Sequence, residues 1–442
     1  MPFINYSTIR YGGSNGINYK NESLKVHNST ITQNTGSGIF ANEDNDGAPA
    51  FTVSLINNTI SNNTYKGIQL YKSGSGNTGT VTIDNNTVTG NAKTGIHVQT
   101  PYATAVTVTN STISGNNTSI NENMFGLYIK TVGTYTVTGN TISNNDRGIQ
   151  ISSGASGGTI SNNTISYNDS RTAGELDGWG YTGGGLFINS PNFSGTFTMQ
   201  NNKIIGNKAR NNSGALLNFD GNSSGATYVI SNNVIAGNLS TDTSYGFASA
   251  TFIAKIFTPG SSTSAISNNI ITQNTAPTYS GATIYLLSNG NTNSFTNNTI
   301  TGNISTNSDG STLFLSGDGD ISNNNIINNQ SAYEAYLGLS LDLNIDNNWW
   351  GSDDSSVVAT KVYDFFDNPS LATFDYTPVL TALNTTAPPE PPTNITSELD
   401  FRNIGLTWAA NAESDIAGYK IYYDTDQSGY PYANSVDVGN VT

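Results

Sequence analysis

One asparagine recurs along most of this 442-residue chain and limits what the chain can fold into. Each copy stands three residues after an aliphatic side chain, in a phrase close to N-N-T-I-S-x-N, as in residues 57–63 and 297–303. The spacing varies from 22 to 39 residues, which is typical of a solenoid with one supersecondary unit per repeat. The asparagines are Asn34, Asn63, Asn91, Asn116, Asn145, Asn168, Asn207, Asn238, Asn274, Asn303 and Asn329.

The residues around this phrase favour strands over helices. Segments such as 80–90 and 134–145 alternate apolar and polar residues with period two, and Gly or Asn interrupts them every few positions. Each repeat is therefore predicted to form one coil of a parallel β-helix, and parallel crossovers favour the right-handed form. The aliphatic positions expected to form its continuous core are Ile31, Ile60, Val88, Ile113, Ile142, Ile165, Ile204, Ile235, Ile271, Ile300 and Ile326.

Stacked coils place equivalent residues about 4.8 Å apart, so each recurring residue should form a column. We expect the Asn side chains to hydrogen-bond to their neighbours above and below, and to occupy the left-handed backbone of a sharp turn. A glycine follows within a few residues, as at Gly67 and Gly95, and is expected to supply a positive φ where the turn ends.

The composition excludes several other classes of protein. There is no Cys and there are only two His, which removes disulfide scaffolds, zinc clusters and thiol nucleophiles. A net charge of −15 argues against nucleic acid and anionic membranes as partners, and no stretch is long and apolar enough for a transmembrane span.

The repeats are predicted to end near residue 350 and to be followed by a cap over residues 351–386. Asp353 or Asp354 should begin a short helix in which Val358, Val362 and Phe365 share one face. The repeats and the phrase N-W-W-G that ends at Gly351 resemble secreted bacterial and archaeal β-helix repeat proteins over about four fifths of the chain. That resemblance implies the fold, a secreted or cell-surface location, and a family of polysaccharide lyases, glycosidases, epimerases and adhesins.

Residues 387–393 are proline-rich and are predicted to form a stiff linker. Residues 394–442 resemble the first half of a fibronectin type III domain, a partial β-sandwich with Leu406 and Trp408 on one strand. We therefore expect a segment before Met1, further strands after Thr442, and a monomeric protein within a larger multidomain chain.

The turn after the ladder asparagine departs from the repeat, and departures are where function is expected. This turn is short in early coils and swells in the middle of the chain, where residues 169–185 form the longest insertion. Basic side chains gather there: Lys66, Lys93, Arg147, Arg171, Lys208 and Arg210. Acidic residues lie among them: Asp146, Asp169, Glu175 and Asp177. These charges indicate either surface ion pairs or a mixed-charge cleft that holds a polar substrate.

The following strand should point a second set of side chains outward by parity: Gln69, Tyr71, His97, Gln99, Tyr128, Lys130, Gln150, Phe187, Tyr285 and Phe314. Exposed aromatic rings can stack on sugars, while Gln and Lys can bind hydroxyls or carboxylates. Trp179 and Tyr181 in the long insertion could close over such a ligand. Alternatively, Phe187 and Phe314 pack beneath the insertions, and His97 is an ordinary surface residue.

Two chemistries fit these residues. A glycosidase needs two carboxylates, which could come from Asp146, Asp169, Glu175, Asp177 and Asp220. A polyuronate lyase needs cations and a base, which could come from Tyr128, Lys130, Arg147, Arg171, Lys208 and Arg210. The candidate catalytic residues are Lys130, Arg147, Asp169, Arg171, Glu175, Asp177 and Lys208, and the candidate substrate-binding residues are Tyr128, Gln150, Trp179, Tyr181 and Arg210.

A calcium site is a separate hypothesis. Residues 42–47 match the first half of a calcium-binding loop, in which Asn42, Asp44 and Asp46 would supply oxygen ligands. The bidentate Glu expected at the twelfth position is replaced by Val53, so the other interpretation is a solvated acidic loop.

Taken together, the sequence predicts a protein that binds a polysaccharide or cell-surface glycan and that could cleave it as a glycosidase or lyase. The alternative is a non-catalytic adhesin or surface-layer component. No cofactor other than calcium is implied.

Overall fold

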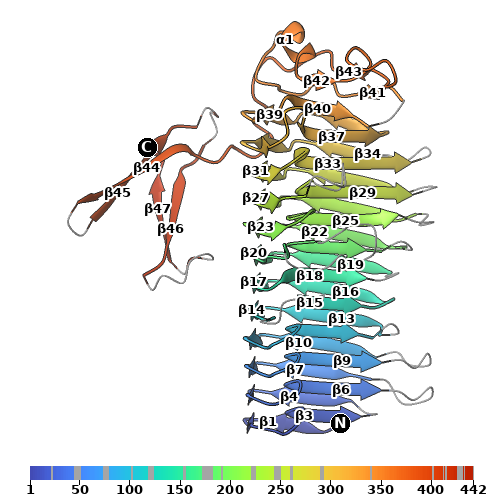
Figure 1. Cartoon of the computed structure of the whole chain (residues 1–442), viewed down its shortest axis with the longest axis vertical. Helices are drawn as coiled ribbons and strands as arrows, with labels where there is room; N and C mark the ends of the chain where they lie inside the picture. The colour runs from blue at the N-terminus through green and yellow to red at the C-terminus, as the bar shows by residue number, and fades with distance from the viewer. Residues whose placement is uncertain are drawn as a thin grey trace.

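The computed structural model shows an elongated column of stacked coils, with the first coil at one end and the short helix α1 at the other (Figure 1). Each coil contributes one strand to each of three long parallel sheets, which we name A, B and C in chain order. The structure describes the whole chain except residues 21–22, 44–50, 73–78, 101–102, 118–123, 153–155, 172–182, 191–192, 221–224, 243–249, 259–261, 289–292, 339–340, 401–402, 412, 414–415, 426–431, 433 and 442.

Sheet A opens each coil, and all of its neighbouring strands are parallel. In its strands every second residue is buried, as the alternation in the sequence predicts. The strands are β1 (Phe3–Asn5), β4 (Leu24–His27), β7 (Val53–Ile56), β10 (Thr80–Asp84), β13 (Ala105–Thr109), β16 (Thr134–Thr138), β19 (Gly157–Ser161), β22 (Thr196–Gln200), β26 (Thr227–Ser231), β30 (Thr263–Ser267), β34 (Asn293–Thr296) and β38 (Asp320–Ser322).

Sheet B is built from three-residue strands centred on the recurring aliphatic residue. Every member of that column from Ile31 to Ile326 is fully buried, so the predicted continuous core is confirmed. The strands are β2 (Thr8–Arg10), β5 (Thr30–Thr32), β8 (Thr59–Ser61), β11 (Thr87–Thr89), β14 (Thr112–Ser114), β17 (Thr141–Ser143), β20 (Thr164–Ser166), β23 (Lys203–Ile205), β27 (Val234–Ala236), β31 (Ile270–Thr272), β35 (Thr299–Thr301) and β39 (Asn325–Ile327).

Sheet C closes each coil and extends one strand further, into the cap. Its strands are β3 (Ile17–Lys20), β6 (Ile39–Glu43), β9 (Ile68–Lys72), β12 (Ile96–Gln99), β15 (Phe125–Lys130), β18 (Arg147–Ser152), β21 (Leu186–Asn189), β25 (Ala215–Asp220), β29 (Phe252–Thr258), β33 (Tyr279–Ser288), β37 (Ser311–Gly317), β40 (Tyr333–Leu337) and β42 (Val362–Tyr363). A narrow sheet D lies in the enlarged turns between B and C, with strands β24 (Lys208–Ala209), β28 (Leu239–Ser240), β32 (Thr275–Ala276) and β36 (Ile304–Ser305).

The predicted asparagine ladder is confirmed at the turn between sheets B and C. From Asn34 to Asn303, each Nδ2 donates to the Oδ1 of the next ladder residue at 2.8–3.1 Å. Most of these amides also donate to a backbone carbonyl, so almost all of their hydrogen-bonding capacity is used inside the column.

A second ladder, which the sequence analysis missed, runs along the turn between sheets A and B. It consists of the residue just before each strand of sheet B from Asn58 to Asn324 and ends at Asn348, with Nδ2 to Oδ1 distances of 2.9–3.0 Å. Ser111 interrupts it, accepting from the backbone N–H of Asn86 and donating its own backbone N–H to Asn140. The column therefore has a polar seam at two of its corners.

Two expectations about the turns were wrong. The left-handed backbone belongs to the residue before the ladder asparagine, such as Asn62 or Gly90, because the ladder residue itself must aim its amide inward. Gly67 and Gly95 have no positive φ; a Cβ at Gly67 would lie 2.6 Å from the carbonyl oxygen of Gly95. Glycine is needed there because the coils approach closely, and not because the turn needs its backbone freedom.

The cap also differs in part from the expectation. Helix α1 (Ser355–Ala359) begins with Asp354 as its N-cap, as predicted, and buries Val358. It ends before Val362, which instead pairs in strand β42 at the edge of sheet C, while Phe365 is 44% exposed. Strand β43 (Phe374–Asp375) follows and pairs in parallel with β41 (Leu343–Asn344), which precedes the helix.

The C-terminal module consists of two antiparallel pairs, β44 (Thr393–Asp400) with β45 (Asn403–Ala409) and β46 (Tyr419–Tyr423) with β47 (Asn434–Gly439). These described strands form two separate two-stranded sheets, so the resemblance to fibronectin type III stays a prediction.

The linker before the module is attached to the side of the column. The carbonyl oxygen of Pro388 accepts from Thr299, and the carboxylate of Glu390 accepts from Thr301 at 2.8 Å and from Asn328 at 3.1 Å. A cavity of about 440 Å³ lies between linker, module and sheet B, with Val234 on the column side. The module therefore rests on sheet B instead of projecting from a free spacer.

Among the described residues, no helix has the length and apolar character needed to span a membrane.

Candidate functional site

The position that follows the ladder asparagine forms a column of polar side chains in the middle of the chain. Asn117, Asp146, Asp169 and Lys208 occupy this position in four successive coils. Backbone bonds from Asp169 N–H to the Asn145 carbonyl and from Lys208 N–H to the Asn168 carbonyl keep these coils in register. The ladder therefore holds two carboxyl groups and a lysine in consecutive coils.

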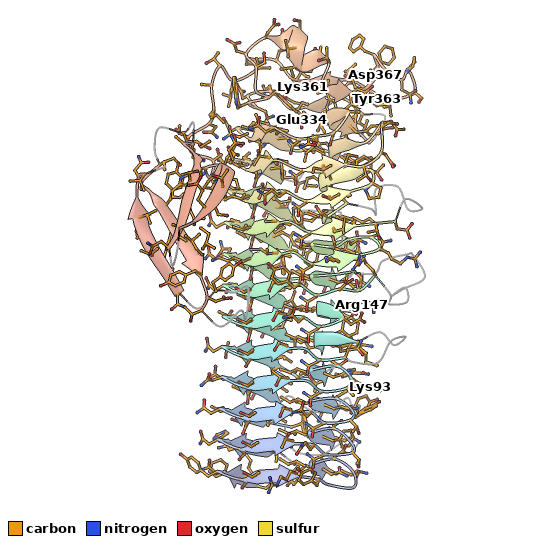
Figure 2. The ribbon with its side chains drawn as sticks, turned by 60° about the vertical axis from the view of Figure 1, so that its left-hand side comes forward. Lys93, Arg147, Glu334, Lys361, Tyr363 and Asp367 are labelled. Atoms are coloured by element: carbon orange, nitrogen blue, oxygen red, sulfur yellow. The ribbon has the colours of Figure 1, made fainter. Side chains whose placement is uncertain are left out.

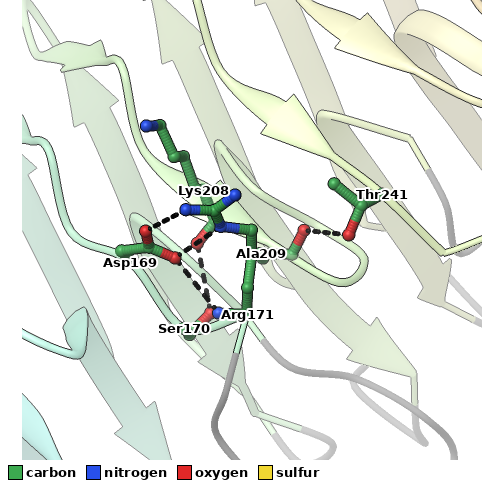
Figure 3. Close-up of polar contacts among 6 residues, drawn as sticks. All are labelled: Asp169, Ser170, Arg171, Lys208, Ala209 and Thr241. Atoms are coloured by element: carbon green, nitrogen blue, oxygen red, sulfur yellow. Dashed lines mark hydrogen bonds and ion pairs between the residues drawn. The ribbon is translucent and has the colours of Figure 1, made fainter.

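Asp169 and Arg171 form a close ion pair at the start of the long insertion (Figure 3). Arg171 donates from Nε at 2.9 Å and from Nη2 at 2.7 Å, and the two side chains are 43% and 40% exposed. Asp169 also lies in a parallel bridge with Lys208. The hydrogen bonds from Arg171 hold the pKa of Asp169 below its usual value, so this carboxylate is ionised at neutral pH.

Asp146 has a different environment. Burial raises its pKa to about 6, although the neighbouring Arg147, the backbone N–H of Met124 and the side chain of Asn117 all oppose that shift. Arg147 is 1% exposed, and its guanidinium lies 5.6 Å from the centre of the Phe125 ring. The expected exposed basic residue is thus a buried one, because the turn packs it against the preceding coil.

The outer face of sheet C carries a second column beside this turn. The strand register aligns Gln69, His97, Tyr128 and Gln150 in four successive coils. The rings of His97 and Tyr128 are 4.7 Å apart, and Lys66 lies 3.1 Å from Nδ1 of His97. Burial and the charge of Lys66 lower the pKa of His97 to about 4, so its imidazole is neutral at physiological pH.

The open part of this column ends at Phe187. Phe187, Leu216 and Ile253 continue the register but are buried in a small apolar cluster with Ala250. Phe314 is 7% exposed and stacks on Tyr336. The interpretation of Phe187 and Phe314 as packed residues is thus confirmed, and the exposed face spans fewer coils than the sequence suggested.

Phe125 connects the turn to the strand face, since its ring contacts Arg147 and lies 5.5 Å from the ring of Tyr128. Figure 2 shows Lys93 and Arg147 on the same side of the column at two levels. The two polar columns are therefore neighbours joined by packed side chains.

The structure places the predicted site residues in three groups. Asp169, Arg171 and Lys208 are brought together in the turn, and Tyr128, Lys130 and Gln150 lie on the face of sheet C. Arg210 lies further along the turn, paired with Asp242 at 2.7 Å. Glu175, Asp177, Trp179 and Tyr181 lie outside the described residues.

The calcium hypothesis falls mostly on residues that the structure does not describe. Asn42 sits on the outer face of sheet C beside Tyr71, whereas Asp44 and Asp46 lie outside the described residues. The described part of the chain contains no group of three or more His, Cys, Asp or Glu side chains placed to hold a metal ion.

Phe125 had no predicted role, and Asp146 was predicted only as one of several possible glycosidase carboxylates. The position of Asp146 strengthens that prediction, because it follows a ladder asparagine as Asp169 does in the next coil. Phe125 carries no such signal, since its contact with Arg147 depends on how the turn packs.

The comparisons with known proteins agree with the fold. Residues 42–235 match the family model described as a right handed beta helix region. This match and the stacked parallel sheets show an all-β, right-handed parallel β-helix. No curated protein and no solved structure matches the chain.

Proposed function

We propose that this chain is a secreted or cell-surface polysaccharide-binding protein whose ligand lies along the outer face of sheet C, beside the turn column. The observation that carries the proposal is the register-aligned series of Gln69, His97, Tyr128 and Gln150 next to a mixed-charge column. A polymer suits this arrangement because each coil offers a new set of side chains about 4.8 Å further along.

The chemistry of this strip favours a neutral or weakly charged glycan. Gln150 and Gln69 can exchange hydrogen bonds with hydroxyl groups, and the Tyr128 ring offers an apolar edge with a polar tip. The turn supplies Asp146 and Asp169 as well as Lys208, so its cations are balanced by carboxylates. The net charge of −15 would also repel a strongly anionic polymer.

Binding to immobilised and soluble polysaccharides tests this function directly. Affinity electrophoresis against β-glucan, xylan, starch, polygalacturonate and alginate should show retardation by at least one of them. Tyr128→Ala and Gln150→Ala should weaken it, while Gln200→Ala in sheet A, on another face, should not. Equal loss in all three variants, or no retardation by any polymer, contradicts the proposal.

The second candidate is a non-catalytic adhesin or surface-layer component. Two nearly unbroken asparagine ladders and a laterally attached module are features that a purely structural rod would also need. An adhesin would recognise a cell-surface glycan without changing it. A binding assay followed by analysis of the recovered glycan separates the two candidates.

Calcium binding by Asn42, Asp44 and Asp46 is a separate proposal with its own test. If these residues hold an ion, a chelator should lower the melting temperature and Asp44→Ala should remove that response. Identical melting curves with and without chelator would return this segment to an acidic loop.

A further inference from the structure

Asp146 and Asp169 form a pair of carboxyl groups suited to catalysis as well as to binding. A catalytic role for them rests on the proposed polysaccharide-binding function. Both follow a ladder asparagine in adjacent coils, and the backbone bond from Asp169 to the Asn145 carbonyl fixes their register. Equivalent positions in stacked coils are about 4.8 Å apart. Retaining glycosidases use two carboxyl groups about 5–5.5 Å apart, whereas inverting enzymes need about 6.5–9.5 Å to admit a water molecule.

The two carboxyl groups differ in the way that such a reaction requires. Asp169 is held ionised and oriented by two hydrogen bonds from Arg171, and it stays 40% exposed. Asp146 is partly buried against the preceding coil, where desolvation favours its protonated form up to about pH 6, its raised pKa. A pair of carboxyl groups whose environments separate their pKa values marks an acid and a base or nucleophile.

We propose that Asp146 is the general acid and Asp169 the nucleophile of a retaining glycoside hydrolase. The Asp146 proton moves to the glycosidic oxygen as its bond to the anomeric carbon breaks, and an Asp169 oxygen bonds to that carbon. A water molecule then attacks the same carbon and gives a proton back to Asp146. The ester bond to Asp169 breaks, and both side chains return to their starting states.

The neighbouring residues have supporting roles in this scheme. Arg171 positions Asp169 and keeps it ionised until it attacks. Arg147 lies next to Asp146 and stabilises its carboxylate form, which helps Asp146 to release its proton to the glycosidic oxygen. Tyr128 and Gln150, on the adjacent strand face, would hold sugar units on either side of the scissile bond.

A bracing role for Asp146 is the alternative, because it accepts hydrogen bonds from Met124 and Asn117 in the preceding coil. Bracing predicts lower stability without any change in a pH profile. The acid role predicts that removing the carboxyl group changes the pH dependence and the choice of leaving group, which a brace would not affect.

The experiment uses the full chain with Asp146→Asn, Asp169→Asn and the control Asp84→Asn, whose carboxylate lies in sheet A. Reducing ends released from the polysaccharide that binds best are measured across pH, and nuclear magnetic resonance follows the configuration of the first product. We expect retention, a fall of roughly 10²–10⁴-fold in Asp146→Asn, and loss of the limb near pH 6. Asp146→Asn should keep more activity towards aryl glycosides with good leaving groups than towards the polysaccharide. Asp169→Asn should lose activity towards both substrates.

Several outcomes overturn the assignment. Binding by the wild-type chain without hydrolysis leaves the proposed function standing and removes the catalytic pair. Hydrolysis with inversion, or an unchanged pH profile in Asp146→Asn, also removes it. Binding measured in both Asn variants shows whether a loss of activity comes from chemistry or from a damaged fold.

Discussion

Two turns of each coil contain a ladder asparagine, but only one of these turns varies in length along the chain. The turn between sheets A and B always contains two residues, as at 57–58 and 162–163. The turn between sheets B and C ranges from residues 144–146 to residues 167–185. Both ladders are buried and have similar hydrogen-bond lengths. A ladder therefore fixes a corner of the coil without limiting what the chain does after it.

The difference separates scaffold from site. In the A–B turn a left-handed residue is followed at once by the ladder residue and the next strand, so the turn carries no further residues. In the B–C turn a left-handed residue also precedes the ladder residue, but no strand of sheet C follows at once, and the chain is then free to carry Asp169, Arg171 and Lys208. The candidate site lies beside the more tolerant of the two corners.

The largest effect should come from breaking either ladder. Asn145→Leu leaves the backbone N–H and Nδ2 of Asn116 without their shared acceptor, and each such donor costs about 1–3 kcal/mol. Asn140→Leu in the A–B turn leaves a single donor, Ser111 N–H, without its acceptor and should cost about half as much. Chemical denaturation of both variants measures the change. A much smaller loss at Asn145 would mean that the B–C corner contributes less to stability.

A smaller effect is expected where neighbouring coils touch at a glycine beside the B–C ladder. Gly67→Ala places a Cβ 2.6 Å from the Gly95 carbonyl oxygen and the Val88 Cγ1, and this crowding should cost about 2 kcal/mol. Gly13→Ala is the matched control, because its new Cβ meets nothing within 4 Å. Equal melting temperatures for the two variants would show that the B–C corner can expand, contrary to its tight packing here.

The B–C ladder ends at a titratable carboxyl group, whereas the A–B ladder ends at Asn348. Stability should therefore depend on pH at the end of the B–C ladder. Asn329 donates to the buried carboxyl of Glu334 at 3.0 Å, and burial raises the pKa of that group. Its stabilising contribution is therefore complete in acid and is lost as the pH rises through the raised pKa. Glu334→Gln should flatten this dependence and stabilise the fold by about 1 kcal/mol near neutral pH.

Thermal melts of the Glu334→Gln variant and the wild type from pH 4 to pH 8 check this prediction. Lys361 in the cap lies close enough to oppose the shift, and Figure 2 shows it near Glu334 at the end of the column. Parallel curves for the two proteins would mean that Lys361 keeps Glu334 charged throughout.

The smallest effect belongs to the exposed ion pair. Arg171→Gln should change stability by less than about 0.5 kcal/mol, because both partners are in contact with water. Arg210→Gln should cost more, since its partner Asp242 has a side chain that is only 9% exposed. Unfolding midpoints of the two variants measure these losses. A larger loss for Arg171→Gln than for Arg210→Gln would mean that the ion pair at the start of the long insertion is the more rigid one.

The sequence was most informative where one position repeats. The column from Ile31 to Ile326 and the ladder from Asn34 onward follow from period and residue type alone, because stacking turns a repeat into a contact. The second ladder was in the same phrase, one residue before the strand, but a side chain next to a turn can point either way. Glycine was found at the right positions for the wrong reason, since crowding and positive φ select the same residue.

The candidate site could be predicted only in part. Asp169 and Lys208 meet because they share a position relative to the ladder, and Arg171 joins them because it lies two residues after Asp169. Arg147 was predicted in that turn, but it begins strand β18 and is buried against Phe125, a contact that depends on the fold of a neighbouring segment. Phe187 shares the register of Gln150, yet an apolar cluster covers it. The alternation along a strand predicts to which face of the sheet a side chain points. It does not predict which other side chains cover it.

The side attachment of the linker has a mechanical consequence. Tension along the column axis would stretch the bonds between coils in series, so the weakest coil would open first. A pull on the C-terminal module instead enters at Thr301 and Asn328, through Glu390, and bypasses the terminal helix and its strands. While the hydrogen bonds of Glu390 hold, the cap carries no load. The module is thus attached to the side of the column, and not only through the cap at its end.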